Sequence, residues 1–89
     1  MKKDVKKNAT QRLSIIAGQV HGIQDMVDEE KYCVDIITQI EAVREALSGV
    51  ENLILQNHLE THVIHQIKTG EENKAVAEIL KIYKLAKIN

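Results

Sequence analysis

Apolar side chains recur at steps of three and four residues along most of the chain, and this is the period of an amphipathic helix. The first stripe predicts a helix over about residues 5–29. This helix begins near Asp4 or Asn8 as N-cap and ends at the acidic run of residues 28–30. The apolar members of the stripe are Leu13, Ile16, Val20, Ile23 and Val27.

A second, longer stripe predicts a central helix over about residues 31–67, because this segment holds no proline and only one interior glycine, Gly49. The face of this helix is formed by Ile36, Ile37, Ile40, Val43, Leu47, Val50, Ile54 and His58. Residues 69–73 then break the pattern, with Gly70 suited to the C′ position. A third helix is predicted over about residues 71–87, with the apolar side chains Val76, Ile79, Leu80, Tyr83, Leu85 and Ile88.

The central helix is too long for the rest of the chain to cover. Some 36 residues at about 1.5 Å each span roughly 54 Å, and both flanking helices are shorter. We therefore expect one all-α domain over residues 1–89, with three helices, whose long central helix packs against a second copy.

The composition indicates the cellular environment in which this fold is expected. Cys33 is the only cysteine and has no disulfide partner, which favours a reducing, cytoplasmic environment. We expect no signal peptide, because residues 1–4 are not followed by an apolar run. We also expect no membrane span, because no stretch approaches 18 uninterrupted apolar residues.

The formal net charge of −1 argues against nucleic-acid binding, but its distribution is uneven. Residues 1–24 hold five basic side chains and one acidic one, whereas residues 25–72 hold three basic and eleven acidic ones. A basic end on an acidic body makes a local positive surface, although helix ends that are merely solvated would show the same charge pattern.

The chemistry of the chain is concentrated in His58, His62 and Cys33. Two histidines four residues apart lie on one face of a helix and can chelate a transition metal, with a thiolate as third ligand. Cys33 precedes His58 by 25 residues, which on one helix is roughly 37 Å. The three residues can meet if two copies of the helix pack antiparallel about a two-fold axis near residues 45 and 46. One dimer would then hold two equal sites.

Other interpretations of these residues stay open. The two histidines could be ordinary surface or interface residues, and Cys33 could be a small buried apolar residue. His65 could be a further ligand or a solvated side chain. The sequence between His58 and His62 is not the metalloprotease pattern, because its glutamate is third and not second. We expect no enzyme, because nothing suggests a cleft or an oxyanion-stabilising group beside Cys33.

Taken together, many of these residues resemble the CsoR/RcnR family of bacterial metal-sensing and stress-sensing transcriptional repressors. The resemblance covers almost the whole chain and rests on Arg12-Leu13, Ile16, Gly18-Gln19-Val20, Gly22-Ile23, Met26-Val27, Glu30, Tyr32-Cys33, Asp35-Ile36, Gln39-Ile40, Ala42, Ala46-Leu47 and His58-Leu59. It implies three helices per chain and an antiparallel homodimer with a four-helix core. It also implies a homotetramer formed as a dimer of dimers.

The resemblance also implies a metal site made of Cys33, with His58 and His62 from the partner chain. Tyr32 and Glu78 match outer-shell positions of the copper-sensing branch, in which they support the ligands. His62 departs from that branch, which has a cysteine there. We favour Cu(I), because thiolate ligation in a site of low coordination number selects it. Ni(II), Co(II) and Zn(II) remain alternatives.

The resemblance is weaker at the positions expected to bind DNA, because Ser14, Ile15 and His21 stand where the family commonly carries basic residues. The candidate phosphate contacts are Arg12, Arg44, Lys2, Lys3, Lys6 and Lys7. We expect modest, strongly salt-dependent affinity and readout of DNA shape. The predicted function is a repressor whose metal-free tetramer binds operator DNA and is released by the metal. A metal-binding helical oligomer that does not touch DNA is the alternative.

Overall fold

The computed structural model describes residues 1–86, and this part of the chain is helical, with no strand. The elements are α1 (Lys3–Asp28), α2 (Cys33–His58), the π-helical turn η1 (Leu59–Val63), α3 (Ile64–Lys68) and α4 (Glu72–Ala86). Because α2, η1 and α3 follow one another without a break, the described chain has three helical runs, and the predicted all-α class is confirmed. The predicted end of the third helix at residue 87, and Ile88 in its stripe, lie outside the described residues.

The helix starts differ from the predicted ones. The first helix begins at Lys3, so the prediction of Asp4 or Asn8 as N-cap was wrong. Lys2 holds the cap position, and its side chain does not cap the helix. Asp4 instead lies in the first turn, where a carboxylate interacts favourably with the positive end of the helix dipole. The second helix begins at Cys33 and not at residue 31, since the amides of Asp35 and Ile36 donate to the carbonyl of Tyr32.

Both chain reversals have the hydrogen bonds of a Schellman motif. After α1, the Lys31 amide donates to the Met26 carbonyl and the Glu30 amide to the Val27 carbonyl, and Glu30 has a φ of 52°. After α3, the Glu71 amide donates to the Gln66 carbonyl, and Gly70 has a φ of 81°. The prediction of Gly70 at C′ is confirmed. At the first reversal a glutamate takes the conformation that glycine adopts without strain.

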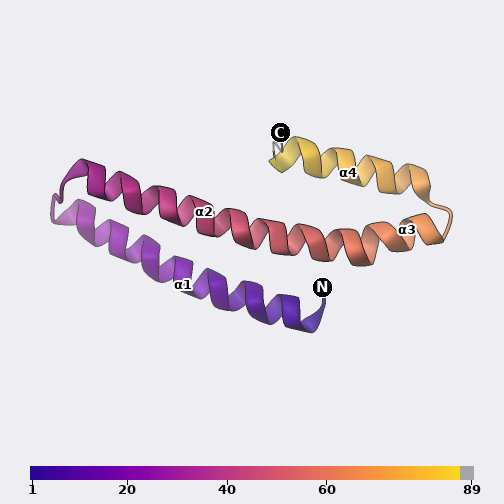
Figure 1. Ribbon diagram of the computed structural model, residues 1–89, viewed down its shortest axis with the longest axis horizontal. Coiled ribbons are helices and arrows are strands. Elements are labelled where there is room, and N and C mark those ends of the chain that lie inside the picture. Colours follow the sequence, from indigo (N-terminus) through magenta and orange to yellow (C-terminus); the bar gives the residue numbers. More distant parts are fainter. Residues whose placement is uncertain (87–89) are drawn as a thin grey trace. The chain divides into compact units, whose positions relative to one another are not determined.

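The chain divides into two compact units, residues 2–54 and a second unit that begins at Leu55. In the first unit the chain reverses direction after α1, and α2 runs back along α1 (Figure 1). The core between them is formed by apolar side chains from both helices, namely Ala9, Ile16, Val43 and Val50, with Ile23, Ala46 and Leu53 packed against them.

The part of α2 in this unit therefore has two apolar faces, where the sequence suggested one. Val43 and Val50 face α1 and are 8% and 4% exposed. Ile37, Ile40, Leu47 and Ile54 stay exposed, with Ile37 as high as 55%. We call these four side chains the exposed stripe of α2.

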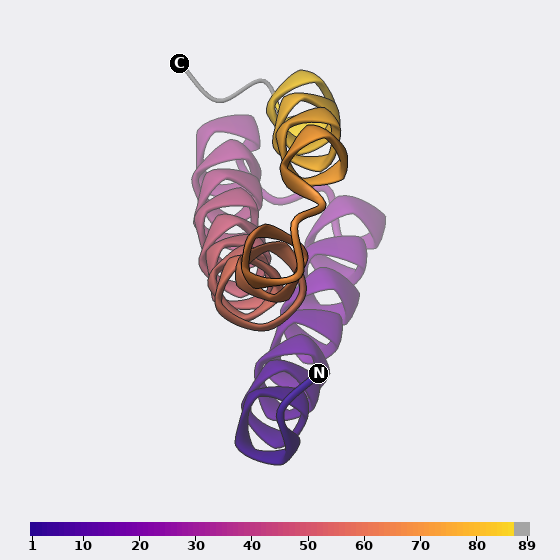
Figure 2. The ribbon, with the colours of Figure 1, turned by 90° about the vertical axis from the view of Figure 1, so that its right-hand side faces the viewer.

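In the second unit, η1 and α3 pack against α4, which turns back beside α3 (Figure 2). The buried apolar side chains here are Val63 and Ala75, each 3% exposed or less. Asn57 and Gln66 are buried polar residues of the same unit. None of the described helices combines the length and the apolar character that crossing a membrane requires.

Candidate metal centre

His58 and His62 lie together in the second unit. His58 is the last residue of α2 and His62 belongs to η1. Their rings are stacked, with centroids 5.0 Å apart and an interplanar angle of 27°. A π turn takes one more residue per hydrogen-bonded ring than an α turn, so side chains four residues apart come closer to lying directly above each other. The local helix type thus brings the two imidazoles into register.

Glu78 reaches the same place from α4. Its Oε1 lies 3.1 Å from Nε2 of His58, and both side chains are about one-third exposed, at 35% and 33%. A carboxylate can only accept when ionised, so this contact favours the His58 tautomer with hydrogen on Nε2. That tautomer leaves the lone pair of Nδ1 available to a metal.

Gln66 is a neighbour of His62 that the sequence analysis missed. Its Nε2 lies 3.3 Å from Nε2 of His62, and its buried Oε1 has no hydrogen-bond partner among the described residues. The signal was present in the sequence, because Gln66 follows His62 by four residues on the same helical run. Gln66 can therefore orient the His62 ring from the next turn.

The donor atoms of His58, His62 and Glu78 all lie within 4.8 Å of one another. This cluster unites two of the three predicted ligands with the predicted outer-shell glutamate. Cys33 and His65 are not part of it. Cys33 is the first residue of α2, belongs to the other unit and is exposed, and Tyr32 beside it is also exposed.

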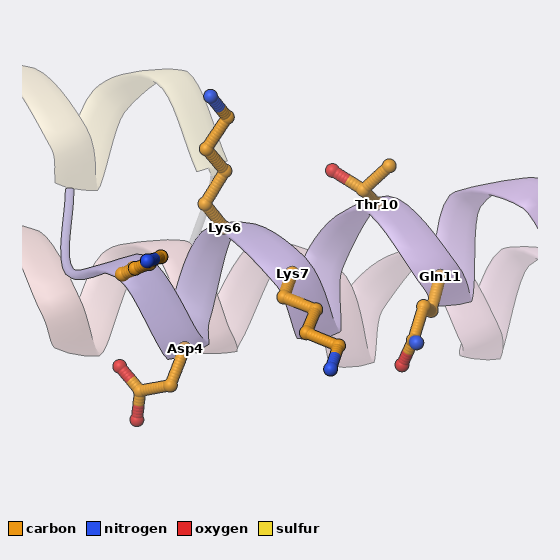
Figure 3. A pocket seen from close by; sticks show the side chains of 6 residues that line it. Asp4, Lys6, Lys7, Thr10 and Gln11 are labelled. Carbon is orange, nitrogen blue, oxygen red and sulfur yellow. The ribbon is translucent and has the colours of Figure 1, made fainter.

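The lysines of the first turns of α1 lie along one face of this helix. Lys6 and Thr10 point to one side of the helix, whereas Asp4, Lys7 and Gln11 point to the other (Figure 3). These five side chains and Lys3 line an open hollow on the surface. Lys6 and Lys7 diverge from this face and can therefore reach separate phosphates.

The two arginines have different surroundings. Nε of Arg12 donates to Oδ1 of Asn8 at 2.9 Å, and its guanidinium lies against Gly49 of α2. Arg44 pairs with Glu41 at 3.2 Å on an exposed part of α2. Asn8 therefore holds the Arg12 guanidinium over α2, while Arg44 is partly neutralised by its neighbour.

Comparison with known proteins identifies the family. Residues 5–84 match the model of the metal-sensitive transcriptional repressors. The chain belongs to this family. The resemblance to CsoR/RcnR repressors is thus confirmed, and so is the prediction that the chain is not an enzyme, since the family consists of transcriptional repressors.

The relatives of this chain include copper sensors. It is 43% identical over 79 residues to the copper-sensing transcriptional repressor CsoR of Bacillus subtilis (strain 168), covering 89% of this chain and 78% of that protein. It is also 43% identical over 65 residues to the copper-sensing transcriptional repressor RicR of Mycobacterium tuberculosis (strain ATCC 25618 / H37Rv), covering 73% and 68%.

A solved member of the family has the same fold. The crystal structure of the copper-sensing repressor CsoR with Cu(I) from Geobacillus thermodenitrificans NG80-2 superposes with a TM-score of 0.90. The two chains are 33% identical, and the match covers 99% of this chain and 92% of the other.

Proposed function

We propose that this family member is a Cu(I)-responsive repressor. Its metal-free homotetramer binds operator DNA in the cytoplasm, and Cu(I) held by Cys33 of one chain with His58 and His62 of its partner releases the DNA. The observation that carries the proposal is the stacked pair of imidazoles, 5.0 Å apart, at the end of α2 opposite Cys33. Imidazole and thiolate together suit Cu(I), and the exposed thiol is accessible to it.

The exposed stripe of α2 supports an inter-chain site. A helix of 26 residues is roughly 39 Å long, so its first residue, Cys33, needs a second chain to meet His58, its last. Cys33 precedes Ile37 by four residues, and His58 follows Ile54 by four. In an antiparallel pair with its axis near residues 45 and 46, Ile37 therefore lies opposite Ile54 and Cys33 opposite His58. The same register that buries the apolar stripe brings the ligands together.

Glu78 and Tyr32 complete the proposed site as outer-shell residues. Glu78 accepts a hydrogen bond from Nε2 of His58, which fixes the imidazole with Nδ1 toward the metal. Tyr32 stands beside Cys33, and both are exposed in the single chain. The phenol is therefore free to contact the partner chain near the thiolate.

The proposed DNA contacts are phosphate contacts from the basic part of α1 and from Arg44. These residues are Lys2, Lys3, Lys6, Lys7, Arg12 and Arg44. Lys6 and Lys7 point in different directions from α1, which suits contacts to the phosphate backbone more than the reading of base edges. Binding of metal and of DNA would be reciprocally coupled, typically by about 5–150-fold.

A second candidate function is the same repressor responding to Zn(II), Ni(II) or Co(II). The observation that favours it is His62, an imidazole at the position where the copper-sensing branch has a thiolate. Imidazole donors are shared by all of these metals, so the number of thiolates decides between them.

Fluorescence anisotropy with labelled promoter DNA tests the proposal. The metal-free protein should bind at low salt, and one Cu(I) per chain should weaken the affinity at least about fivefold. The Cys33→Ala variant should bind DNA in the same way and ignore Cu(I). Failure of the metal-free protein to bind DNA at any salt concentration would favour a metal-binding scaffold instead. A response to Zn(II), Ni(II) or Co(II) but not to Cu(I) would favour the second candidate.

A further inference from the structure

The cluster of His58, His62 and Glu78 is formed within one chain and within one compact unit. It therefore needs neither Cys33 nor a partner chain. Nε2 of His58 and Oε1 of Glu78 are 3.1 Å apart, and the donor atoms of the three residues all lie within 4.8 Å of one another.

These separations are close to those of a coordinated ion. Zinc lies about 2.0–2.2 Å from imidazole nitrogen and carboxylate oxygen, so two ligands in a tetrahedral site are roughly 3.3 Å apart. The His58–Glu78 pair already has this spacing. Because His62 is exposed, its ring can rotate and bring its nitrogen to ligand distance from the same ion without disturbing a packed core.

The donor set selects a different ion from the one in the proposed copper site. Two imidazoles and one carboxylate, with a fourth position open, are a common set for Zn²⁺ and for divalent ions of similar character. None of the three donors is a thiolate, so the soft ligand that favours Cu(I) is missing.

We propose that His58, His62 and Glu78 of a single chain bind one divalent cation of the Zn²⁺ type, with Glu78 as a direct ligand and without Cys33. This site shares its two imidazoles with the proposed copper site. The divalent cation and Cu(I) therefore compete for the protein. Glu78 is a ligand in one state and a hydrogen-bond acceptor in the other.

Co(II) titration of the full chain tests this site, because Co(II) follows Zn(II) coordination and absorbs visible light. The Cys33→Ala variant should bind one Co(II) per chain with wild-type affinity, and Zn(II) should displace it. Adding Glu78→Gln to Cys33→Ala should weaken binding at least about tenfold. Adding Glu72→Gln, a change at an exposed position in the first turn of α4, should leave binding unchanged.

A further pair of variants separates a ligand from a supporting residue. With Cys33 removed, Glu78→Cys supplies the only thiol, so its Co(II) complex should gain a sulfur-to-metal charge-transfer band in the near ultraviolet. Glu72→Cys in the same background should show none. Loss of Co(II) binding in Cys33→Ala, or absence of the band in Glu78→Cys, would overturn the inference. Either result leaves the proposed copper site standing, because that site is tested by Cu(I) binding through Cys33.

Discussion

Nε2 of His58 lies 3.1 Å from Oε1 of Glu78, a residue 20 positions further along the chain. This contact joins the end of α2 to α4, and both side chains are only about one-third exposed. A carboxylate in this position restrains the ring, fixes its tautomer and adds a negative charge beside it. The identity of residue 78 is therefore expected to influence the affinity of His58 for any metal that it binds.

Glu78→Ala should weaken Cu(I) binding by about 10–100-fold, because the imidazole loses the group that orients it. Glu78→Gln should cost less, since the amide oxygen still accepts the hydrogen bond from Nε2. Competition with a Cu(I) chelator measures both affinities, and Glu72→Ala is the matched control on α4. Equal affinity in Glu78→Ala and the wild type would contradict an outer-shell role.

Glu30→Gly should stabilise the fold by about 1 kcal/mol, because Glu30 has a φ of 52°, where a side chain strains the backbone. Glu29→Gly is the matched control. Glu29 has a φ of −84°, so glycine there relieves no strain. It brings its entropic cost and removes the exposed pair with Lys31, and it should destabilise by about 0.5–1 kcal/mol. Urea unfolding gives both values. A loss of stability in Glu30→Gly would show that the backbone at this turn is not strained.

The two apolar faces of α2 should respond differently to substitution. Leu47→Lys, in the exposed stripe, should dissociate the oligomer, because the charge would be buried between chains. Val50→Ala, in the core with α1, should lower the free energy of unfolding by about 1–3 kcal/mol and leave the interface between chains intact.

Sedimentation velocity distinguishes these outcomes. Thr38→Lys is the control for Leu47→Lys, since Thr38 is exposed on the side of the helix away from the stripe. An unchanged oligomer in Leu47→Lys would place the interface elsewhere on the chain.

Substitution of the N-terminal lysines should reduce the salt dependence of DNA binding. If Lys6 and Lys7 each neutralise one phosphate, Lys6→Ala and Lys7→Ala should each lower the slope of log K against log salt by about 0.9. Lys31→Ala is the control, because Lys31 pairs with Glu29 in the turn between α1 and α2. Anisotropy titrations over a range of salt concentrations measure the slopes. Identical slopes in all variants would remove α1 from the DNA interface.

The positions of the helices could be predicted from the sequence because the apolar period and the Gly70 turn are local signals. The break at residues 28–30 was predicted as well, but the positive φ of Glu30 was not, since a glutamate in this conformation has no propensity signal of its own. The division of the α2 pattern into two faces also required the structure. Spacing places Val43 and Leu47 close together on the helix, but only α1 decides which of them it covers.

The site was predictable to a different extent. The spacing of His58 and His62 suggested a pair, whereas the π turn that contains His62, and with it the stacking of the two rings, was not predicted. Glu78 was expected only through the resemblance to a family, because 20 residues separate it from His58 and no local pattern connects them. Gln66 was missed, since a glutamine four residues after a histidine is common without any function.

Subunit mixing tests the inter-chain copper site most directly. Cys33→Ala chains lack the thiol, and His58→Ala/His62→Ala chains lack both imidazoles, so neither homodimer has a complete site. If the ligands come from two antiparallel chains, each mixed dimer contains one intact site and one without ligands. Refolding the two variants together in equal amounts should therefore restore about a quarter of the wild-type high-affinity Cu(I) stoichiometry. No recovery above the separate variants would contradict a site shared between chains.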